Sequence, residues 1–156
     1  MTGLSRETDI VLDPEGQWWS GGARLTHPGV TEAFAGWLRR APDGRWALEN
    51  RLHWMYVRVE GAPLHARGVE DQGGRPVLLL AGGEREPLRP GTLREGPDGA
   101  LYAWARDGTW AVRLDPRAAL DLAPWLAEGE GGPALRVAGQ LHPIPRVSDP
   151  LGQQSE

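Results

Sequence analysis

Turn-forming sequences recur along this chain at short intervals, and they leave room between them for strands and for little else. They combine glycine with proline or aspartate at 13–16, 42–44, 97–99 and 107–108, and Gly-Gly pairs follow at 73–74, 82–83 and 131–132. Many of the intervening segments have the length of a typical strand. We therefore expect strands near 10–13, 17–20, 45–48, 52–60, 64–70, 76–81, 86–94, 100–106, 109–114, 134–138 and 140–144.

Two segments have the periodicity of an amphipathic helix instead. In the first, over about 28–40, a Thr-His-Pro sequence supplies the start and apolar residues recur at positions 30, 34, 37 and 38. In the second, over about 116–128, Asp115 is a good N-cap and Pro116 occupies the first helical position. Its apolar residues, at 118, 122, 125 and 126, have the same spacing. The fold class expected is α+β, mostly antiparallel strands with two helices.

The similarity of the two helical segments continues beyond the helices. In both, a strand precedes a helix that starts with proline and ends in Trp-Leu, and a glycine-containing turn and a strand follow. We interpret this as an internal duplication, and the alternative is coincidence between two amphipathic helices. The duplication predicts two half-domains, 1–61 and 62–145, followed by a polar and flexible tail over 146–156.

Composition excludes several classes of protein. The chain has 156 residues and no cysteine, which excludes disulfides, thiol catalysis and thiolate metal sites and favours a cytoplasmic location. No apolar stretch reaches the length of a signal peptide core or a membrane span, so we expect no membrane partner. The net charge of −4, with both signs scattered, predicts no extended nucleic-acid surface. A single nucleotide remains a candidate ligand.

Motifs of enzymes and metal sites are absent. The sequence has no glycine-rich phosphate loop, no GxSxG and no HExxH. His53 and His65 fall on neighbouring expected strands, but two histidines do not make a zinc site, and a structural role is the default for each. Carboxylates such as Glu49 and Glu70 lie near expected hairpin ends, where solvated charges are common. We therefore expect no enzyme, no metal and no cofactor.

Residues 100–114 form the most informative segment. Asp107-Gly108 between alternating residues is a strong hairpin signal, and a two-residue turn pairs Arg106 with Thr109. The same register pairs Trp104 with Ala111 and Tyr102 with Arg113. One face of this hairpin is then uniformly apolar and must face the core. That face consists of Leu101, Ala103, Ala105, Trp110, Val112 and Leu114.

The opposite face of the hairpin combines aromatic rings with guanidinium groups. It carries Tyr102, Trp104, Arg106 and Arg113, with the small Ala111 beside them. A planar or anionic ligand would find stacking and charge contacts on such a face. The alternatives are that the other half-domain covers the face, or that arginine stems shield exposed rings.

A similar mixture of side chains occurs in the first half. Along the strand from Leu52, alternation places Trp54, Tyr56, Arg58 and Glu60 on one side. If the duplication is correct, this face and the hairpin face are equivalent and could meet at a shared interface. An interface of that kind is a common place for a ligand.

From Asp13 to about Ile144 the chain resembles the bacterial domain-of-unknown-function family 1285 (DUF1285). The resemblance rests on an early aromatic strand, Asp43-Gly44 after the helix, and three further short segments. The segments concerned are Gly16-Gln17-Trp18-Trp19, Val59-Glu60-Gly61-Ala62-Pro63-Leu64, Arg106-Asp107-Gly108 leading to Arg113-Leu114, and Gly139-Gln140-Leu141-His142-Pro143-Ile144. The resemblance implies a duplicated α+β core whose C-terminal half is superficially like a pleckstrin-homology fold. It implies no established activity, and it suggests a nucleotide-like ligand between the halves and a signalling role.

The chain departs from the family pattern before its central strand. Where relatives are expected to carry Thr-Pro and Glu-Lys-Trp, this sequence has Glu49-Asn50 and Leu52-His53-Trp54 and retains only the tryptophan. The resemblance therefore carries over only Trp54, Glu60, Arg106 and Arg113. Together with the strand faces it gives a set of candidate ligand-binding residues. They are Trp54, Arg58, Glu60, Tyr102, Trp104, Arg106 and Arg113.

Three functions are consistent with these observations. The first, which we favour, is a regulatory module that binds a small ligand, either nucleotide-like or otherwise planar and anionic, in a cleft lined by arginine and aromatic residues. The second is a protein-interaction module of pleckstrin-homology type, which would show a large exposed apolar patch. The third is an enzyme, which would show paired carboxylates with opposed pKa shifts in a cleft.

Overall fold

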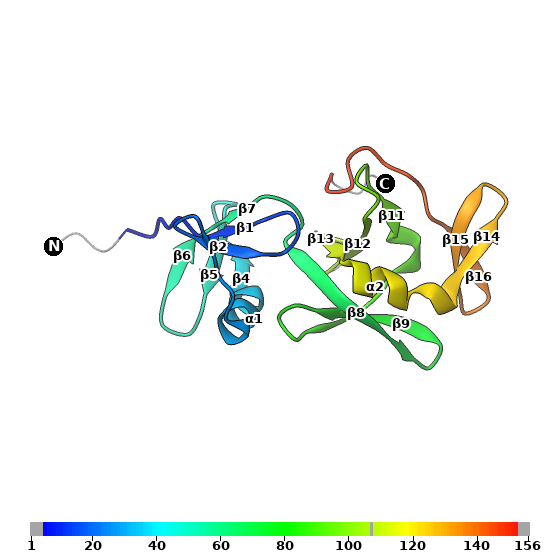
Figure 1. Cartoon of the computed structure of the whole chain (residues 1–156), viewed down its shortest axis with the longest axis horizontal. Helices are drawn as coiled ribbons and strands as arrows, with labels where there is room; N and C mark the ends of the chain where they lie inside the picture. The colour runs from blue at the N-terminus through cyan, green and yellow to red at the C-terminus, as the bar shows by residue number, and fades with distance from the viewer. Residues whose placement is uncertain (1–4, 107, 153–156) are drawn as a thin grey trace.

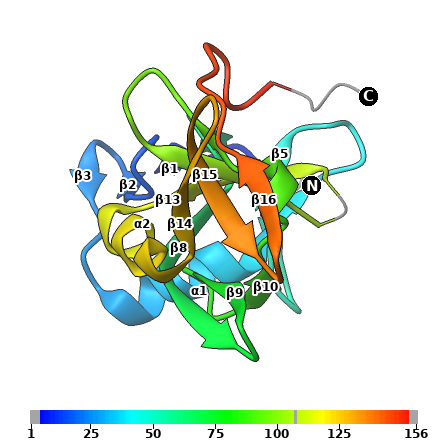
Figure 2. The same cartoon turned by 90° about the vertical axis from the view of Figure 1, so that its right-hand side faces the viewer.

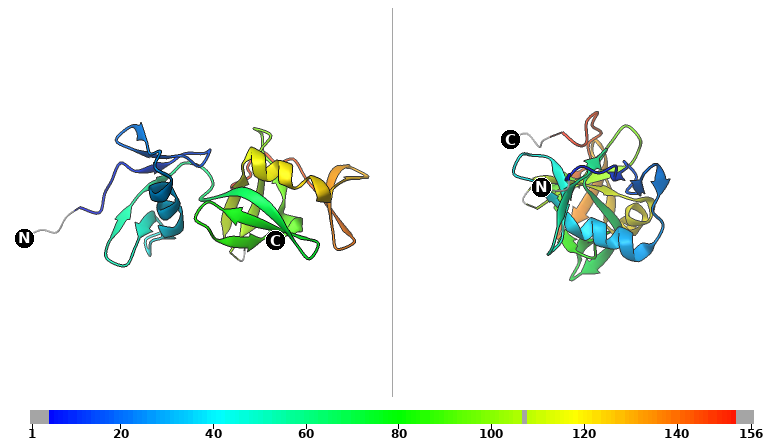
Figure 3. Two further views of the ribbon diagram at one scale, coloured as in Figure 1. Left: turned by 60° about the horizontal axis from the view of Figure 1, so that its bottom comes forward. Right: turned by 90° about the vertical axis from the view of Figure 1, so that its left-hand side faces the viewer.

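The closely spaced turns divide the chain into four small sheets arranged along one long axis (Figures 1 and 3). A computed structural model describes residues 5–106 and 108–152. The strands are β1 Val11–Leu12, β2 Trp18–Ser20, β3 Ala23–Arg24, β4 Leu38–Arg40, β5 Trp46–Glu49, β6 Trp54–Tyr56, β7 Arg58–Val59, β8 Leu64–Gln72, β9 Arg75–Leu80, β10 Arg85–Pro87, β11 Arg94–Glu95, β12 Leu101–Ala105, β13 Trp110–Leu114, β14 Leu126–Gly129, β15 Gly132–Val137 and β16 Gln140–Pro143. The helices are α1 Pro28–Trp37 and α2 Pro116–Asp121, with 3-10 turns at η1 Pro90–Thr92 and η2 Ala123–Trp125. The mostly antiparallel α+β class predicted from the sequence is confirmed.

The first half contains two sheets and α1. One sheet has the order β3-β2-β1-β7, with β1 and β7 parallel, and the other has the order β4-β5-β6. The turn between β1 and β2 is closed by Asp13, whose Oδ1 accepts the backbone N–H groups of Glu15 and Gln17 at 2.9 Å. Between the sheets and the helix, Trp18 packs edge-on against Phe34 with 5.4 Å between ring centroids.

The second half is built on a six-stranded sheet with the order β10-β9-β8-β13-β12-β11. Helix α2 packs against β8, and the carboxylate of Asp121 accepts the backbone N–H of Val69 at 3.1 Å. That bond lies beside the irregular step between Ala66 and Gly68 in the β8–β9 pairing. The remaining sheet, β14-β15-β16, lies at the end of the molecule opposite the first half and faces the viewer in Figure 2.

The hydrophobic core is divided in the same way as the sheets. One buried cluster draws on β8, β9, β12, β13, α2 and β15, and Leu114, Leu122 and Leu135 are among its least exposed members. A second cluster, around Leu12 and Leu38, draws on the first half and includes Trp110 as a partly buried member. Trp110 contacts both clusters, so the tip of the β12–β13 hairpin joins the two halves.

The order of elements agrees with the predicted duplication. Helix α1 is followed directly by the meander β4-β5-β6, and α2 with its 3-10 turn is followed directly by the meander β14-β15-β16. Each helix starts with proline after a side-chain cap: His27 Nδ1 accepts the N–H of Gly29 at 3.1 Å, and Asp115 Oδ1 accepts that of Ala118 at 2.9 Å. Superposition of the two units, and the likeness of the second half to a pleckstrin-homology fold, stay predictions.

Both helices are shorter than the sequence predicts. Helix α1 ends at Trp37 rather than near 40, because Leu38–Arg40 pairs with β5 and buries Leu38. Helix α2 ends at Asp121 rather than near 128, because Pro124 cannot continue a hydrogen-bonded helix and Leu126–Gly129 pairs with β15. Apolar spacing located both helices, but it did not show that the residues expected to form their last turns belong to strands.

Two expected strands are divided in the structure. The strand expected over 52–60 forms β6 and β7, which belong to different sheets on either side of the buried Val57. The strand expected over 86–94 forms β10, the turn η1 and β11. Strands β10 and β11 lie at opposite edges of the six-stranded sheet. Pro87 and Pro90 lack a backbone donor, so a continuous strand there would lose ladder hydrogen bonds.

The segment after Arg146 does not leave the fold as a free tail within the described residues. The backbone of Val147 donates to the carbonyl of Glu95 at 2.9 Å, so the chain continues along β11. The Arg94 guanidinium donates to the carbonyl of Pro150, which is buried. Residues 146–150 are therefore bonded to the fold, 153–156 lie outside the described residues, and the flexibility of the tail stays a prediction.

No helix in the described part of the chain has the length and apolarity needed to cross a membrane.

The two helix-terminal tryptophans differ in burial, which predicts different effects on stability. Trp125 is 7% exposed and its indole N–H donates to the carbonyl of Gly74 at 2.9 Å, whereas Trp37 is only half-buried. Trp125→Ala should lower the free energy of unfolding by about 3–5 kcal/mol, and Trp37→Ala by clearly less. Urea denaturation of both variants measures the difference, and equal losses would contradict the packing described.

Candidate functional site

The two halves lie in close contact where a residue without a side chain leaves room for the other half. A Cβ atom added at Gly82, in the β9–β10 loop, would lie 2.8 Å from the backbone nitrogen of Gly36 in α1. A Cβ atom at Gly16, in the first half, would lie 2.8 Å from Nδ1 of His65 in the second half. Side chains at these positions would hold the halves apart, so the glycines determine how closely the halves pack.

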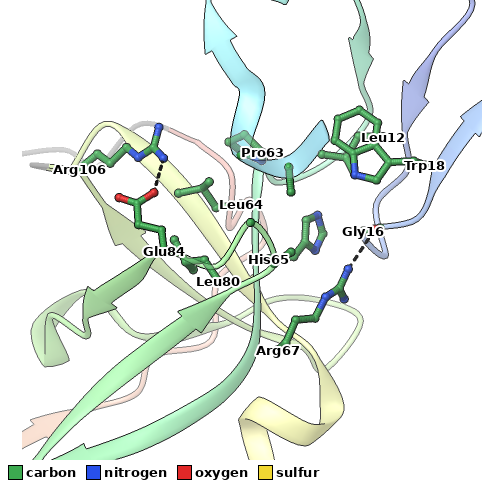
Figure 4. Close-up of a pocket in the computed structure, with 14 residues that line it drawn as sticks. Leu12, Gly16, Trp18, Pro63, Leu64, His65, Arg67, Leu80, Glu84 and Arg106 are labelled. Atoms are coloured by element: carbon green, nitrogen blue, oxygen red, sulfur yellow. Dashed lines mark hydrogen bonds and ion pairs between the residues drawn. The ribbon is translucent and has the colours of Figure 1, made fainter. Parts of the chain in front are cut away.

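A pocket of about 150 Å³ opens beside these contacts, and both halves contribute its walls (Figure 4). The first half contributes Leu12, Gly16, Trp18, Ala35 and Gly36. The second half contributes Pro63, Leu64, His65, Arg67, Leu80, Ala81, Gly82, Glu84 and Arg106. We call this space the interhalf pocket.

The interhalf pocket has an apolar middle and a guanidinium group at each end. Leu64 and Leu80 lie in the middle, Arg67 lies at one end, and Arg106 lies with Glu84 at the other (Figure 4). Arg106 and Glu84 form an ion pair with 2.7 Å between nitrogen and oxygen. Glu84 compensates Arg106 within the pocket walls, whereas the carboxylate paired with Arg67, that of Asp115, lies 3.6 Å away and does not line the pocket.

Arg67 is oriented by contacts with both halves. Its guanidinium donates to the carbonyl of Gly16 at 3.1 Å, and it lies 3.6 Å from the carboxylate of Asp115 at the start of α2. A guanidinium has five N–H donors, so these two contacts leave donors for a ligand. Alternation along β8 places Arg67 on the same face as His65.

His65 is 3% exposed and carries an unused acceptor. Its Nε2 atom lies 3.0 Å from the carbonyl of Ala62, which can only accept, so Nε2 bears the proton of the neutral ring. Nδ1 is then unprotonated, and it is the buried side-chain atom without a hydrogen-bond partner among the described residues. Burial, with the nearby charge of Arg67, lowers the pKa of His65 to about 4.

The seven residues predicted from the sequence do not converge on one site. Arg106 alone among them lines the interhalf pocket. Its guanidinium also lies over the ring of Trp110, 4.2 Å from the centroid. The hairpin register is confirmed, since Trp104 pairs with Ala111 and Tyr102 with Arg113; Asp107 of the turn lies outside the described residues.

The hairpin face predicted to be open to a ligand is covered. Tyr102 and Trp104 are 8% and 5% exposed, and the guanidinium of the buried Arg94 lies 4.6 Å from the ring of Trp104. Arg113 pairs with Asp98 at 3.5 Å. The face is covered, but not by the other half-domain: residues 60–63, which link β7 to β8 (the linker), pack there through Ala62, and so does the segment near Pro150.

The corresponding residues of the first half lie apart from the hairpin face. Trp54 is on β6 under the guanidinium of Arg6, 4.6 Å from its ring centroid, and packs edge-on against Tyr56. Arg58 and Glu60 form an exposed ion pair at 2.9 Å. The predicted meeting of the two aromatic faces is wrong, because β6 lies on the side of the first half away from the hairpin (Figure 1).

Part of the site between the halves could have been predicted from the sequence. His65 and Arg67 are two residues apart on an expected strand, and period-two alternation places them on one face. The expected neighbour of His65 was His53, which the structure places in an exposed loop between β5 and β6. No local signal shows that Gly16, more than forty positions earlier, closes over the same histidine.

The described residues contain neither a cluster of metal-ligating side chains nor a pair of carboxylates lining the interhalf pocket. Within residues 5–106 and 108–152, no group of three or more His, Asp or Glu side chains is arranged to hold a metal ion. Glu84 is the carboxylate that lines the interhalf pocket, and Arg106 neutralises it.

Two crystal structures share this architecture. A DUF1285 family protein from Silicibacter pomeroyi is 22% identical, with a TM-score of 0.65 over 88% of this chain and 80% of that one. A DUF1285 family protein from Shewanella baltica is 20% identical, with a TM-score of 0.54 over 72% of this chain and 87% of that one. No family model and no curated protein matches the sequence. The chain therefore has the fold of DUF1285 proteins, and the resemblance inferred from its sequence is confirmed at the level of the fold.

The buried His65 predicts a loss of stability in mild acid. Its pKa of about 4 lies below the ordinary value of 6.5, so the unfolded chain binds the proton more tightly. The free energy of unfolding should keep its full value above about pH 6.5 and fall as the pH is lowered toward 4, by about 3 kcal/mol in all. Urea unfolding of the wild type and of His65→Gln between pH 7 and 4.5 measures this, and equal slopes in both proteins would refute it.

The close approach of Gly82 to Gly36 predicts a specific cost for one added methyl group. Gly82→Ala would force the β9–β10 loop away from α1 and should lower the free energy of unfolding by about 1–3 kcal/mol. Gly131→Ala is the matched control, because a Cβ atom there meets nothing within 4 Å. Thermal unfolding compares the two variants, and similar small losses would mean that the halves do not depend on this contact.

Proposed function

We propose that this protein is a binding module that takes a compact anionic ligand in the interhalf pocket and uses it to fix the two halves relative to each other. The pocket walls from both halves, with Arg67 at one end, are the observation that supports this most directly. A ligand that contacts both halves stabilises whichever arrangement of them it fits best. That property would suit a regulatory or signalling role, and it needs no chemical step.

The size of the pocket narrows the class of ligand. An apolar cavity of about 150 Å³ accommodates a molecule the size of benzene, and the interhalf pocket has a similar volume. A whole nucleotide is larger. The proposal therefore favours a short aliphatic carboxylate, or else one portion of a nucleotide-like ligand.

The chemical character of the walls indicates how the ligand would be oriented. Arg67 would bind the anionic group with its remaining donors, and Leu64 and Leu80 would contact an apolar portion. The ion pair of Arg106 and Glu84 offers both a donor and an acceptor at the opposite end. A ligand with an anion at one end and a neutral polar group at the other matches this distribution.

The protein-interaction alternative has less support. The most exposed large apolar side chains are Leu52, at 83%, and Leu120, at 73%, and they lie on different halves. Single exposed leucines are common on soluble proteins and do not form a patch. A ligand between the halves remains the better explanation of the Arg67 and His65 arrangement.

A thermal-shift screen tests the proposal. The panel should contain inorganic phosphate, short mono- and dicarboxylates, and nucleoside monophosphates. A compound present at a hundredfold excess over its dissociation constant stabilises the folded state by about 2.7 kcal/mol. We expect at least one compact anion to raise the melting temperature, and Arg67→Gln to weaken its binding by about tenfold or more in calorimetric titration.

Arg136→Gln is the control, because Arg136 is an exposed arginine on β15, in the sheet farthest from the pocket. It should bind the compound as the wild type does. A panel without any stabilising compound, or a compound whose affinity Arg67→Gln leaves unchanged, would overturn the proposal.

A further inference from the structure

A second pocket, of about 190 Å³, lies between the halves and shares Pro63 with the interhalf pocket. The first half contributes Arg40 and Trp46 to it, and the hairpin contributes Trp104 and Ala111. Leu151 of the C-terminal segment lies at its wall. We call it the tryptophan pocket.

The two indole rings that line the tryptophan pocket are held in place by other contacts. Trp46 packs edge-on against Trp110, with 4.8 Å between centroids and 85° between planes, and Arg40 lies 4.0 Å from its centroid. Trp104 is 5% exposed, packs against Ala62 and Ala111, and has the guanidinium of Arg94 4.6 Å from its ring centroid. Rings fixed before a ligand arrives lose little conformational entropy when it binds.

Small residues leave the space beside these rings open. Ala111 lies opposite Trp104 in the β12–β13 ladder, and Gly61 lies in the linker. A larger side chain at position 111 would fill the volume next to the indole. With a volume of about 190 Å³, the pocket is large enough for one six-membered ring, because a cavity of about 150 Å³ accommodates benzene.

Arg40 gives this pocket its charge. Within the described residues no carboxylate lines it, and the Arg40 guanidinium donates to the carbonyl of Gly44 at 2.8 Å. The remaining donors of Arg40 are available to an anion at the pocket mouth, because the residue is exposed. The interhalf pocket differs in this respect, since Glu84 neutralises one of its arginines.

We propose that the tryptophan pocket binds a planar aromatic carboxylate, with its ring against Trp46 and the small exposed part of Trp104, and its carboxylate on Arg40. Indole faces favour an aromatic ring over a saturated ring of equal size. A guanidinium favours a carboxylate over an uncharged group because it can donate two parallel hydrogen bonds. The inference does not depend on the function proposed for the interhalf pocket, which has different charged residues.

Three probes separate the contributions of ring and charge. Benzoate carries both, cyclohexanecarboxylate carries the charge on a saturated ring, and benzamide carries the ring without the charge. We expect benzoate to raise the melting temperature and to bind about threefold or more tighter than cyclohexanecarboxylate, and roughly tenfold tighter than benzamide. Equal affinities for the three compounds, or no binding of benzoate, would overturn the inference.

Neighbouring arginines on β4 provide matched variants. Arg40→Gln should weaken benzoate binding by about tenfold, whereas Arg39→Gln should leave it unchanged, since Arg39 bonds to the carbonyl of Gly36 on the other side of the strand. Arg67→Gln, in the interhalf pocket, should also leave the affinity of benzoate for the tryptophan pocket unchanged, as read from the indole N–H resonances of Trp46 and Trp104. A loss with Arg39→Gln or Arg67→Gln equal to that with Arg40→Gln would show that benzoate binds elsewhere.

A variant that fills the pocket gives a second readout. Ala111→Val should remove benzoate binding, and the indole N–H resonances of Trp46 and Trp104 should shift with benzoate only in the wild type. Trp46→Phe and Trp104→Phe assign those resonances. Resonances that move equally in Ala111→Val would contradict the placement of the ring beside residue 111.

Discussion

The packing of backbone against backbone between the halves is the constraint on which both pockets depend. Gly36 and Gly82 allow α1 to touch the β9–β10 loop, and Gly16 allows the β1–β2 turn to lie against His65. Without these contacts the walls from the first half would separate from those of the second. Each pocket is thus a property of the arrangement of the halves rather than of either half.

Arginine stacked on aromatic rings explains why the most suggestive side chains in the sequence do not form one site. Among the described residues, Arg94 lies over Trp104, Arg106 over Trp110 and Arg6 over Trp54. Arg40 lies over Trp46 in the same way. Such cation–π contacts engage a ring face and part of the arginine's interactions within the chain. A face rich in aromatic rings and arginines can therefore be paired largely within the chain. An arginine stays available to a ligand where its contacts within the chain use only part of its N–H donors.

Sequence reasoning succeeded where local physics decides the structure. The hairpin register followed from the turn at Gly108 and from alternation, and both helix starts followed from a capping side chain and proline. It failed where contacts between separate segments decide the structure. Leu38–Arg40, for example, pairs with β5 although its apolar spacing continues that of the helix. The covering of Trp104 by the linker and the C-terminal segment has no local signal either.

The two pockets are connected through the linker, and this limits how independently they can act. Pro63 contributes to both, and each has walls from both halves. A ligand that changes the placement of the halves at one pocket necessarily changes the walls of the other. Such coupling is reciprocal in free energy. If an anion on Arg67 strengthens the binding of an aromatic carboxylate on Arg40, then that carboxylate strengthens the binding of the anion by the same factor.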